Sequence, residues 1–330
     1  MRKSQHVDSY VIAHGDLDGL TSAATILNVL ANRGKTVRVM LAHPHSLAEV
    51  VYRVPPVDTE LLVIVDIAVD EATWAAVKGR VKSLKDYGVK VMWVDHHPST
   101  FEVKEELKNL GVEVLVKLTP AVAPIVREKF LRHTTKPQFF NELLMIGEAG
   151  DRAIVLRDAR LANIFETLSL AIELDALDEE FKLKLVKMWA YSQKFLDDEV
   201  AVRAEKAAEI FARIYERAKK RVVYSSDRMV VIDMVGVKLR GFSGRLAAQI
   251  AEETGKVCFL LLRAGYEELV VTCRVPPDVE FDANKAIREI ARKFEGSGGG
   301  HKKAAAARVL MVHRKDIINY IKERYGKVSA

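Results

Sequence analysis

The sequence predicts an α/β protein, in which a parallel-sheet catalytic domain is joined by a helical connector to a smaller mixed α/β domain. Apolar strand-like runs alternate with helical patterns early in the chain, and residues 61–66 read LLVIVD, which is typical of a strand buried on both faces. A helix-rich stretch with few Gly or Pro follows at residues 157–222, after which strands resume. We therefore expect domains over residues 1–195 and 227–330, with a helical linker over residues 196–226.

Each element is assigned from its own pattern of apolar residues. In the first domain we expect helices at residues 20–33, 71–87 and 121–131, and strands at residues 10–14, 37–41, 61–66, 89–95 and 112–116. The charged segment 197–221 predicts one long connecting helix. In the second domain we expect strands at residues 229–235, 257–262, 269–275 and 309–312, and helices at residues 244–253, 284–294 and 316–324. The alanines at residues 304–307 predict the start of a further helix.

Length and composition exclude several classes of protein. A chain of 330 residues with 49% hydrophobic residues can bury a large core, so we expect a globular protein of two domains. The N-terminal residues MRKSQHVDSY do not form a secretion signal, and no apolar run reaches the ~18 residues of a membrane span, so a cytoplasmic protein is expected. Cys258 and Cys273 are too few for a disulfide framework or a Cys-rich zinc site, and both are expected in core strands.

Positive charge is concentrated near the C-terminus. Residues 228–330 contain 19 Lys and Arg against 12 Asp and Glu, whereas the rest of the chain is nearly neutral. This asymmetry fits a polyanionic ligand that is bound by a basic domain while an acidic domain performs the chemistry. A chance imbalance on a solvated surface is the alternative explanation.

Acidic and imidazole side chains follow three predicted strands of the first domain. The sequence HGDLDG follows the first strand, one aspartate ends the third, and the run DHH ends the fourth. Ligand sites in open parallel sheets lie beyond the carboxyl ends of the strands, so these groups should converge, and a Gly-Asp-Arg turn can reach the same place. The candidate residues are His14, Asp16, Asp18, Asp66, Asp95, His96, His97 and Asp151.

So many carboxylates in one cleft predict bound cations. They would repel one another or change protonation unless cations neutralised them. Carboxylate and imidazole ligands without thiolate suit Mn²⁺ or a similar ion, and more ligands than one ion needs suggest two ions. Each motif alone has an ordinary explanation, such as a helix cap for D-x-D-G or a surface turn for G-D-R. Their occurrence in order at equivalent strand ends favours the metal site.

Together these motifs resemble the DHH phosphoesterase superfamily with a C-terminal DHHA1 domain. The resemblance is carried by HGDLDG at residues 14–19, Asp66, DHH at residues 95–97, Asp151, and GGGH at residues 298–301, which span nearly the whole chain. The family includes RecJ-type exonucleases, oligoribonucleases that also dephosphorylate phosphoadenosine phosphate, cyclic-dinucleotide phosphodiesterases and, more distantly, family II pyrophosphatases.

The resemblance implies metal ligands among the matching residues. Asp16 is expected to hold one ion, and Asp18 and His96 the other, with Asp66 bridging the two ions and Asp151 completing the ligands of the second ion. Two Mn²⁺ ions are expected, with Mg²⁺ or Co²⁺ as alternatives, in a two-metal mechanism with in-line attack on phosphorus.

The resemblance implies other roles for the remaining motif residues. His14 is counted as a metal ligand, and it stands two residues before Asp16, where several family members have a histidine four residues before the first aspartate. Asp95 is expected to orient a histidine and His97 to face the scissile phosphate, so both are expected to act in catalysis.

The C-terminal domain is expected to bind the substrate. The glycine run precedes a predicted helix, whose first backbone N–H groups would bind phosphate oxygens. Arg274 matches the place where family members present an arginine to a phosphate, and Arg245 is a second candidate. A flexible loop and ordinary surface arginines are the alternatives. The expected substrate-binding residues are Arg245, Arg274, Gly298, Gly299, Gly300 and His301.

These implications favour a phosphodiesterase, and specifically an exonuclease that hydrolyses single-stranded DNA or RNA to mononucleotides. One alternative is an oligoribonuclease for very short chains that also acts on phosphoadenosine phosphate. A non-catalytic RecJ-like replication scaffold ranks lower, because the expected metal ligands are present. Expected partners are single-stranded nucleic acid or short oligonucleotides, a repair or replication protein such as a helicase, and a second copy of the chain. No membrane association is expected.

Overall fold

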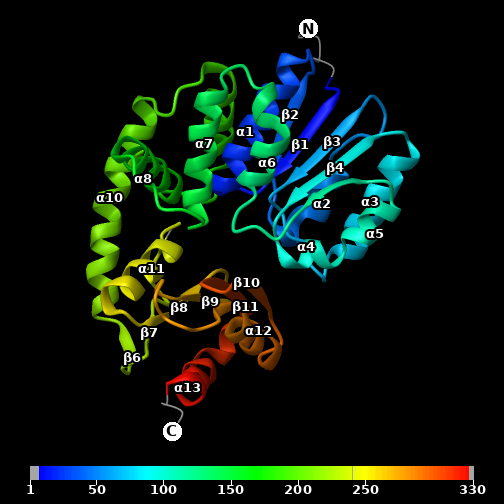
Figure 1. Ribbon diagram of the computed structural model, residues 1–330. Coiled ribbons are helices and arrows are strands. Elements are labelled where there is room, and N and C mark those ends of the chain that lie inside the picture. The colour runs from blue at the N-terminus through cyan, green and yellow to red at the C-terminus, as the bar shows by residue number, and fades with distance from the viewer. Residues whose placement is uncertain (1–6, 240, 327–330) are drawn as a thin grey trace. The chain divides into compact units, whose positions relative to one another are not determined.

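The structure is a computed structural model that describes residues 7–239 and 241–326 (Figure 1). Residues 1–6, part of the segment considered for a secretion signal, lie outside the described residues. The chain divides into two compact units: the first unit contains residues 1–172 and 177–204, and the second unit contains residues 173–176 and 205–330. Among the described residues, no helix is both long and apolar enough to cross a membrane.

A five-stranded, all-parallel sheet forms the centre of the first unit, in the strand order β2-β1-β3-β4-β5. Its strands are β1 (Ser9–Ala13), β2 (Val37–Leu41), β3 (Leu61–Val65), β4 (Lys90–Asp95) and β5 (Glu113–Val116). Val63 of β3 pairs with Val11 of β1 on one side and with Met92 of β4 on the other. The predicted parallel sheet is therefore confirmed.

Helices cover both faces of this sheet (Figure 1). One face packs against α1 (Leu17–Asn32), α6 (Ala123–Phe130) and α7 (Pro137–Gly150). The other carries α2 (Leu47–Tyr52), α3 (Trp74–Asp86) and α5 (Lys104–Asn109), and the short α4 (Pro98–Glu102) follows β4. Because alternate strand residues point to opposite faces, both Val63 and Ile64 are buried, and the continuous apolar run at residues 61–65 follows from this double cover.

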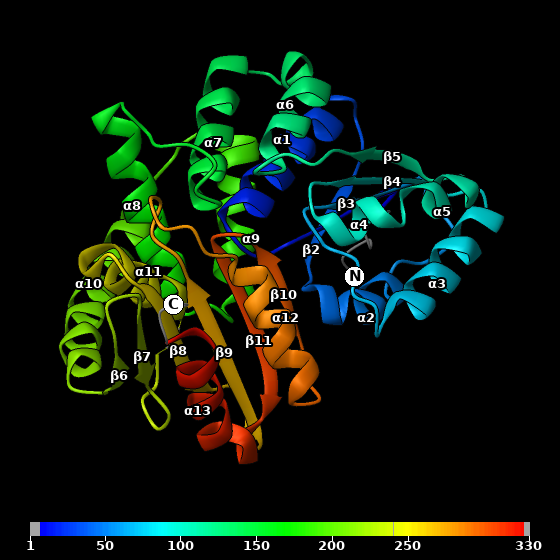
Figure 2. The same ribbon diagram turned by 60° about the horizontal axis from the view of Figure 1, so that its bottom comes forward.

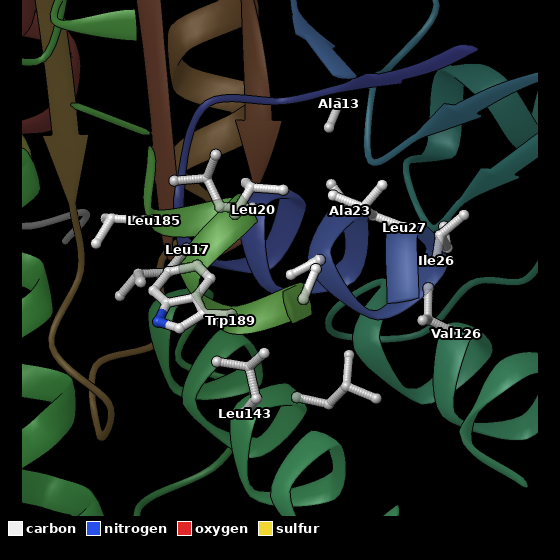
Figure 3. Packing of buried hydrophobic residues seen from close by; sticks show 14 of the residues in the cluster. Ala13, Leu17, Leu20, Ala23, Ile26, Leu27, Val126, Leu143, Leu185 and Trp189 are labelled. Carbon is white, nitrogen blue, oxygen red and sulfur yellow. The ribbon is translucent and has the colours of Figure 1, made fainter. Parts of the chain in front are cut away.

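Part of the predicted helix-rich stretch packs on α1, namely α9 (Glu179–Lys187) and a π-helical turn (Met188–Ser192). The stretch also contains α8 (Ala159–Glu173) and α10 (Asp198–Lys219), so the expected long helix is also confirmed. Figure 3 shows Leu17 and Leu20 of α1 near Leu185 and Trp189, with Leu143 of α7 below them. The buried Trp189 Nε1 donates a hydrogen bond to the carbonyl of Phe195 at 3.1 Å. This packing fixes the start of α1, which carries part of the acidic motif.

The second unit is built on a six-stranded mixed sheet, in the strand order β10-β11-β9-β8-β7-β6. Its strands are β6 (Val222–Ser225), β7 (Met229–Asp233), β8 (Val257–Arg263), β9 (Glu268–Arg274), β10 (Ser297–His301) and β11 (Ala304–Leu310). Strands β7 and β8 pair in parallel and the other neighbours are antiparallel, which confirms the predicted mixed α/β domain. Cys258 and Cys273 are buried core residues of β8 and β9, as expected.

Three helices pack on this sheet. α12 (Ala283–Lys293) and α13 (Arg314–Tyr325) lie over the same face, as Figure 2 shows, and contribute Ile287, Ile290 and Ile317 to its core. α11 (Ser243–Thr254) contacts β8 and β9 and lies outside that apolar cluster. All three helices correspond to predicted ones.

The prediction of a helix at residues 304–307 is wrong. These alanines belong to β11, which forms an antiparallel hairpin with β10, and His301 pairs with Ala304. The two strands approach closely: a Cβ on Gly298 would lie 2.7 Å from the Cβ of Ala307, and Gly300 has a φ of 147°. Pairing of distant strands therefore outweighs the helix propensity of alanine here.

Lys303, at the turn of this hairpin, is held by backbone carbonyls. Its Nζ donates hydrogen bonds to the carbonyls of Pro276, Pro277 and Val279 at 3.1, 2.9 and 2.6 Å. An ammonium group has three N–H donors, so all of them are used inside the protein. The adjacent Lys302 is exposed and lies 3.3 Å from Glu280. Lys303 therefore fastens the hairpin to the loop after β9.

Replacing Lys303 with Met should lower the free energy of unfolding of the second unit by about 1–3 kcal/mol, because three carbonyls lose a charged donor. Lys302→Met is the matched control and should change that free energy by less than about 0.5 kcal/mol. Urea denaturation followed by circular dichroism measures both values. Equal stabilities of the two variants would contradict the structural role of Lys303.

Candidate metal centre

The acidic motifs meet at the carboxyl ends of β1, β3 and β4, which are adjacent strands. His14 and Asp16 follow β1, Asp66 follows β3, and Asp95 ends β4. Because β2 lies on one side of β1 and β3 on the other, the direction of the strand order reverses there. Open parallel sheets bind ligands at such a reversal, outside the carboxyl ends of the strands.

A tight turn connects β1 to α1. The Oδ1 atom of Asp16 accepts a hydrogen bond from the N–H of Gly19 at 3.1 Å and so caps α1. A Cβ on Gly19 would lie only 2.5 Å from the carbonyl oxygen of His14, so this position requires glycine. The turn leaves Asp16 half-exposed and buries Asp18 completely.

Two glycines of α7 allow it to approach α1 closely. A Cβ on Gly147 would lie 2.3 Å from Thr21 Oγ1, and one on Gly150 would lie 3.0 Å from the Cβ of Leu17. Because neither position carries a side chain, the end of α7 reaches the start of α1. This approach brings Asp151, the residue after α7, to the strand ends.

Asp18 is bound by backbone groups at the start of α6. Its Oδ2 and Oδ1 atoms accept hydrogen bonds from the N–H groups of Val122 at 2.6 Å and Ala123 at 3.2 Å. Burial and the charge of Asp16 raise the pKa of Asp18 to about 8, although the two N–H groups oppose the shift. A nearby cation would reverse this shift and restore the carboxylate.

Burial also disfavours the charged form of two of the other aspartates. Burial, with the charges of Asp16, Asp18 and Asp151, raises the pKa of Asp66 well above its usual value. Burial and the charges of Asp18 and Asp16 likewise raise the pKa of Asp151. Asp66 also has a φ of 60°, a strained backbone conformation for a non-glycine residue. Within the described ranges, its buried Oδ1 atom accepts no hydrogen bond.

His96 is oriented for metal binding. Its Nδ1 lies 3.0 Å from the carbonyl oxygen of Thr119, which can only accept, so Nδ1 carries the proton and Nε2 a lone pair. Nε2 lies 3.3 Å from Asp66 Oδ1 and 3.4 Å from Asp151 Oδ2. A histidine that donates one ring N–H to a carbonyl and directs the other nitrogen to carboxylates is typical of metal sites.

Two groups of these side chains could each hold an ion, and a further group of Asp66, Asp95, His96 and His97 shares one residue with each of them. Within each group, one ligand atom from every residue lies within 4.8 Å of the others. Because Asp66 of one group lies beside His96 of the other, the groups adjoin. Carboxylate and imidazole donors without thiolate, together with the unsatisfied Asp66 Oδ1, fit a divalent cation. The groups are His14, Asp16 and Asp66, and Asp18, His96 and Asp151.

Asp95 and His97 form a pair at the edge of these groups. His97 Nδ1 donates a hydrogen bond to Asp95 Oδ1 at 2.8 Å, and Asp95 is completely buried. Burial alone would lower the pKa of His97, but the charge and hydrogen bond of Asp95 raise it. The pair therefore favours the protonated form of the imidazole. The structure thus brings together all the residues predicted to act in metal binding and catalysis.

His43 belongs to the same cluster and is not among the predicted site residues. His14 places Nδ1 2.7 Å from Asp16 Oδ2 and Nε2 3.2 Å from His43 Nδ1. The ring of His43 also stacks on that of His45. A signal for His43 exists, because it follows the end of β2 as the other motifs follow their strands.

The predicted substrate-binding residues lie in the second unit. Arg274 of β9 pairs with Ala304 of β11, which pairs with His301 of β10. Paired residues of an antiparallel sheet point to the same face, so Arg274 and His301 share one face at one end of the sheet. The expected phosphate site at a helix start is not formed, because residues 298–300 lie in the edge strand β10. Backbone groups of an edge strand are available for other partners.

Arg245 is engaged within the second unit. Its guanidinium forms an ion pair with Glu173 and lies over the ring of Phe211, 5.8 Å from the ring centre. Gly244, the preceding residue, lies against Arg274, since a Cβ there would be 3.2 Å from Arg274 Nη2. The ion pair gives Arg245 a clear structural role, and its substrate-binding role stays a prediction.

Two family models match the chain. Residues 8–147 match the model described as the DHH family, N-terminal domain, and residues 234–326 match that of the DHHA1 domain. A sequence search among curated proteins finds no match.

Solved structures with the same fold cover both units of the chain. A pGpG-specific phosphodiesterase from Vibrio cholerae has 15% identity and a TM-score of 0.60, over 96% of this chain and 98% of that one. RecJ from Thermus thermophilus in complex with Mn²⁺ has 17% identity and a TM-score of 0.59, over 97% of this chain and 52% of that one. The DHH domain of a member of a family of ribosomal proteins has 18% identity and a TM-score of 0.67, over 98% of this chain and 88% of that one. This chain thus spans about half the length of RecJ.

Without divalent ions, the first unit should lose stability as the pH rises from about 5 to 8. Asp18, Asp66 and Asp151 have a pKa raised by folding, so the folded state holds protons that the unfolded state has lost. The stability that such a group contributes is fully present below its pKa in the unfolded state. It is lost as the pH rises through its pKa in the folded state, which is about 8 for Asp18. His14 and His97, with pKa values raised by neighbouring aspartates, act in the same direction.

The measurement is the thermal unfolding temperature in EDTA across this pH range. Asp18→Asn should flatten the pH dependence, whereas Asp86→Asn, at an exposed position of α3, should leave it unchanged. Added Mn²⁺ should raise the unfolding temperature most at the upper end of the range. A stability that rises with pH in EDTA would contradict the assigned carboxyl shifts.

Proposed function

Because the chain belongs to the DHH phosphoesterase superfamily and carries a DHHA1 domain, we propose that it is a metal-dependent phosphodiesterase that acts on single-stranded nucleic acid. The reaction we propose is exonucleolytic hydrolysis of DNA or RNA to mononucleotides. The observation that carries the proposal is the convergence of four aspartates and two histidines at three adjacent strand ends of the first unit. Side chains of this kind, held this close, suit a pair of divalent ions.

We assign the two metal positions to the two groups of side chains. His14, Asp16 and Asp66 would hold one ion, and Asp18, His96 and Asp151 the other, with Asp66 shared between them. When bound, the ions supply an activated water and positive charge for the phosphoryl oxygens. Mn²⁺ is the first candidate, and Mg²⁺ and Co²⁺ are alternatives. The likeness to RecJ structures in complex with Mn²⁺ and with Mg²⁺ supports this assignment.

His97, held in place by Asp95, would act on the substrate directly after the ions are in place. Asp95 fixes the ring of His97 through Nδ1, so Nε2 is the atom that can reach a phosphate oxygen. A raised pKa allows His97 to hold a proton there and to donate it as charge develops on the oxygen. The complete burial of Asp95 keeps its hydrogen bond strong.

The second unit would bind the rest of the strand. Residues 228–330 carry 19 basic and 12 acidic side chains, which favours a polyanion. Arg274 and His301 on one sheet face, beside the glycine edge strand of residues 298–300, would contact phosphates. The replication or repair partner, such as a helicase, and self-association remain predictions.

A second candidate is the hydrolysis of very short oligonucleotides. The pGpG-specific phosphodiesterase and this chain match over nearly the full length of both, whereas RecJ is matched over about half of its length. This likeness supports a substrate of a few nucleotides. Such a substrate agrees with the alternative expected from the sequence, an oligoribonuclease that also acts on phosphoadenosine phosphate.

Digestion of end-labelled DNA and RNA strands of graded length tests the proposal. Strands should be shortened in Mn²⁺ and left intact in EDTA. Asp66→Ala should lower kcat roughly a thousandfold or more, because it removes a ligand from both metal positions. Asp86→Ala is the exposed control and should keep wild-type activity. Near-normal turnover of the Asp66 variant would eliminate the two-metal assignment. The length with the highest kcat/KM separates the exonuclease from the oligonucleotidase.

Substitutions in the second unit should weaken substrate binding more than they slow the chemical step. Arg274→Ala and His301→Ala should raise KM about tenfold while changing kcat much less, because each removes a phosphate contact and leaves the metal ligands intact. Arg263→Ala, at an exposed position of the neighbouring strand β8, should leave KM unchanged. Loss of metal occupancy with normal oligonucleotide affinity in either variant would show that the roles of the two units are wrongly assigned.

A further inference from the structure

A pocket outside the metal centre lies between α9 and the segment that leads to α10. Its volume of about 430 Å³ is within the range of small-molecule sites. One face of α9 contributes part of the lining, and the π-helical turn with the residues after it contributes the rest. All of this lining belongs to the first unit. It includes Lys184, Lys187, Met188, Tyr191, Lys194 and Asp197.

This pocket is separate from the metal centre. α1 begins at the centre, where it carries Asp18, and Asn28 lies about 15 Å further along the helix at 1.5 Å per residue. The side chain of Asn28 donates a hydrogen bond at 2.8 Å to the carbonyl of Ala190, the residue before Tyr191. Tyr191 is therefore positioned by the far end of α1, and the six residues of the two metal groups do not line the pocket.

The wall of the pocket after the π-helical turn is held by contacts with the rest of the first unit. Gln193 has a left-handed backbone conformation with a φ of 51°, and its Nε2 donates a hydrogen bond to Thr135 Oγ1 at 2.6 Å. The ring of Phe195 lies on that of Phe139, with centres 4.5 Å apart, and its carbonyl accepts the indole N–H of Trp189. π-Helical turns and strained backbone conformations occur frequently at functional sites.

The lining has an excess of positive charge. The Nζ atom of Lys184 lies 3.1 Å from Asp197 Oδ2 and also forms an ion pair with Glu199, so the acid of the lining already has a cation. Lys187 and Lys194 are exposed, and within residues 7–239 and 241–326 neither of them forms an ion pair. Two ammonium groups are therefore available to an anion at this pocket.

Tyr191 adds an aromatic surface beside these cations. It is 57% exposed, and the half-buried Met188 is a second apolar side chain of the lining. Nucleic-acid bases stack on exposed aromatic rings, while ammonium groups bind phosphate as point charges. Inorganic phosphate could use only the lysines, whereas a nucleotide uses both kinds of surface. The combination of cations and an exposed ring thus fits a nucleotide better than a simple anion.

We propose that this pocket binds a nucleotide, with its phosphate on Lys187 and Lys194 and its base against Tyr191. The inference rests on the proposed phosphodiesterase function for the class of its ligand, because nucleic acid is the proposed substrate and mononucleotides are the proposed products. The nucleotide is either one unit of a bound strand or a free mononucleotide. Both present the same phosphate and base to the pocket, and the experiment distinguishes them.

Photocrosslinking locates the bound nucleotide. 5-Iododeoxyuridine reacts with nearby aromatic side chains on irradiation, and it is supplied as its monophosphate or within a single strand of about 15 nucleotides. The protein is kept in EDTA, so that strands stay intact. Mass spectrometry should find a crosslink at Tyr191 and none at Tyr87, which is 65% exposed and lies outside the pocket. A crosslink from the strand alone identifies a strand unit, and one from the monophosphate identifies a site for free nucleotides. Absence of a Tyr191 crosslink from both would overturn the inference.

Titration calorimetry in EDTA measures what the pocket contributes to affinity for the ligand that crosslinks. Tyr191→Ala, and Lys187→Met combined with Lys194→Met, should each weaken binding about tenfold, because one removes the stacking surface and the other the phosphate contacts. Tyr191→Phe should retain the affinity, since it keeps the ring. If the ligand is the free nucleotide, inorganic phosphate should bind about tenfold more weakly than the monophosphate.

Matched control variants change the same residue types elsewhere in the first unit. Tyr87→Ala, and Lys82→Met combined with Lys90→Met, replace exposed side chains outside the pocket and should bind the ligand as the wild type does. Equal losses of affinity in the control and pocket variants would show that net charge and exposed rings act without a specific site.

The outcomes also separate this inference from the proposed function. Normal hydrolysis of the strand in Mn²⁺ by a protein whose pocket variants bind like the controls would overturn the pocket and leave the phosphodiesterase in place. A crosslink at Tyr191 that depends on the two lysines, in a protein that hydrolyses no strand, would support the pocket and remove the proposed function. Thermal unfolding checks each variant, and Gln replaces Met at both lysines if the double variant does not fold.

Discussion

Repulsion among buried carboxylates at one end of the parallel sheet is the constraint on which the first unit depends. Asp18 and Asp66 are almost completely buried, and burial together with the charges of Asp16 and Asp18 raises the pKa of Asp66 and of Asp151. The fold offsets part of this cost with donors, because two N–H groups of α6 bind Asp18 and the turn of α1 binds Asp16. Asp66 keeps an unsatisfied oxygen and a strained backbone. Cation binding and the stability of this unit are therefore coupled.

Close backbone approach determines where these carboxylates can lie. Gly19 lets the chain turn sharply after β1, and Gly147 and Gly150 let α7 contact α1 without intervening side chains. Asp151 reaches the centre only because α7 ends there, and Gly15 leaves room for the ammonium of Lys182. Each glycine removes a side chain where a functional group must come near. The site is thus a consequence of helix packing as much as of the sheet.

Basic residues of the second unit have unequal roles despite their common charge. Lys303 donates all three of its N–H groups to backbone carbonyls, and Arg245 forms an ion pair with Glu173. Arg274 and His301 share one face at one end of the sheet, and Arg274 Nη1 also donates a hydrogen bond to the carbonyl of Cys273 at 3.0 Å. Net charge therefore overstates the number of side chains that are available to a polyanion.

The sequence by itself determined the parallel sheet, the long helix α10 and the set of residues from His14 to Asp151, because continuous apolar runs and acidic strand ends are local patterns. Only the tertiary structure decided the strand order, which joins Asp66 to Asp16 across adjacent strands. It also decided that residues 304–307 form a strand, and that His43 and Lys182 lie beside His14 and Gly15. These features depend on contacts between segments far apart in the chain, and such contacts leave no periodic signal in the residues that make them.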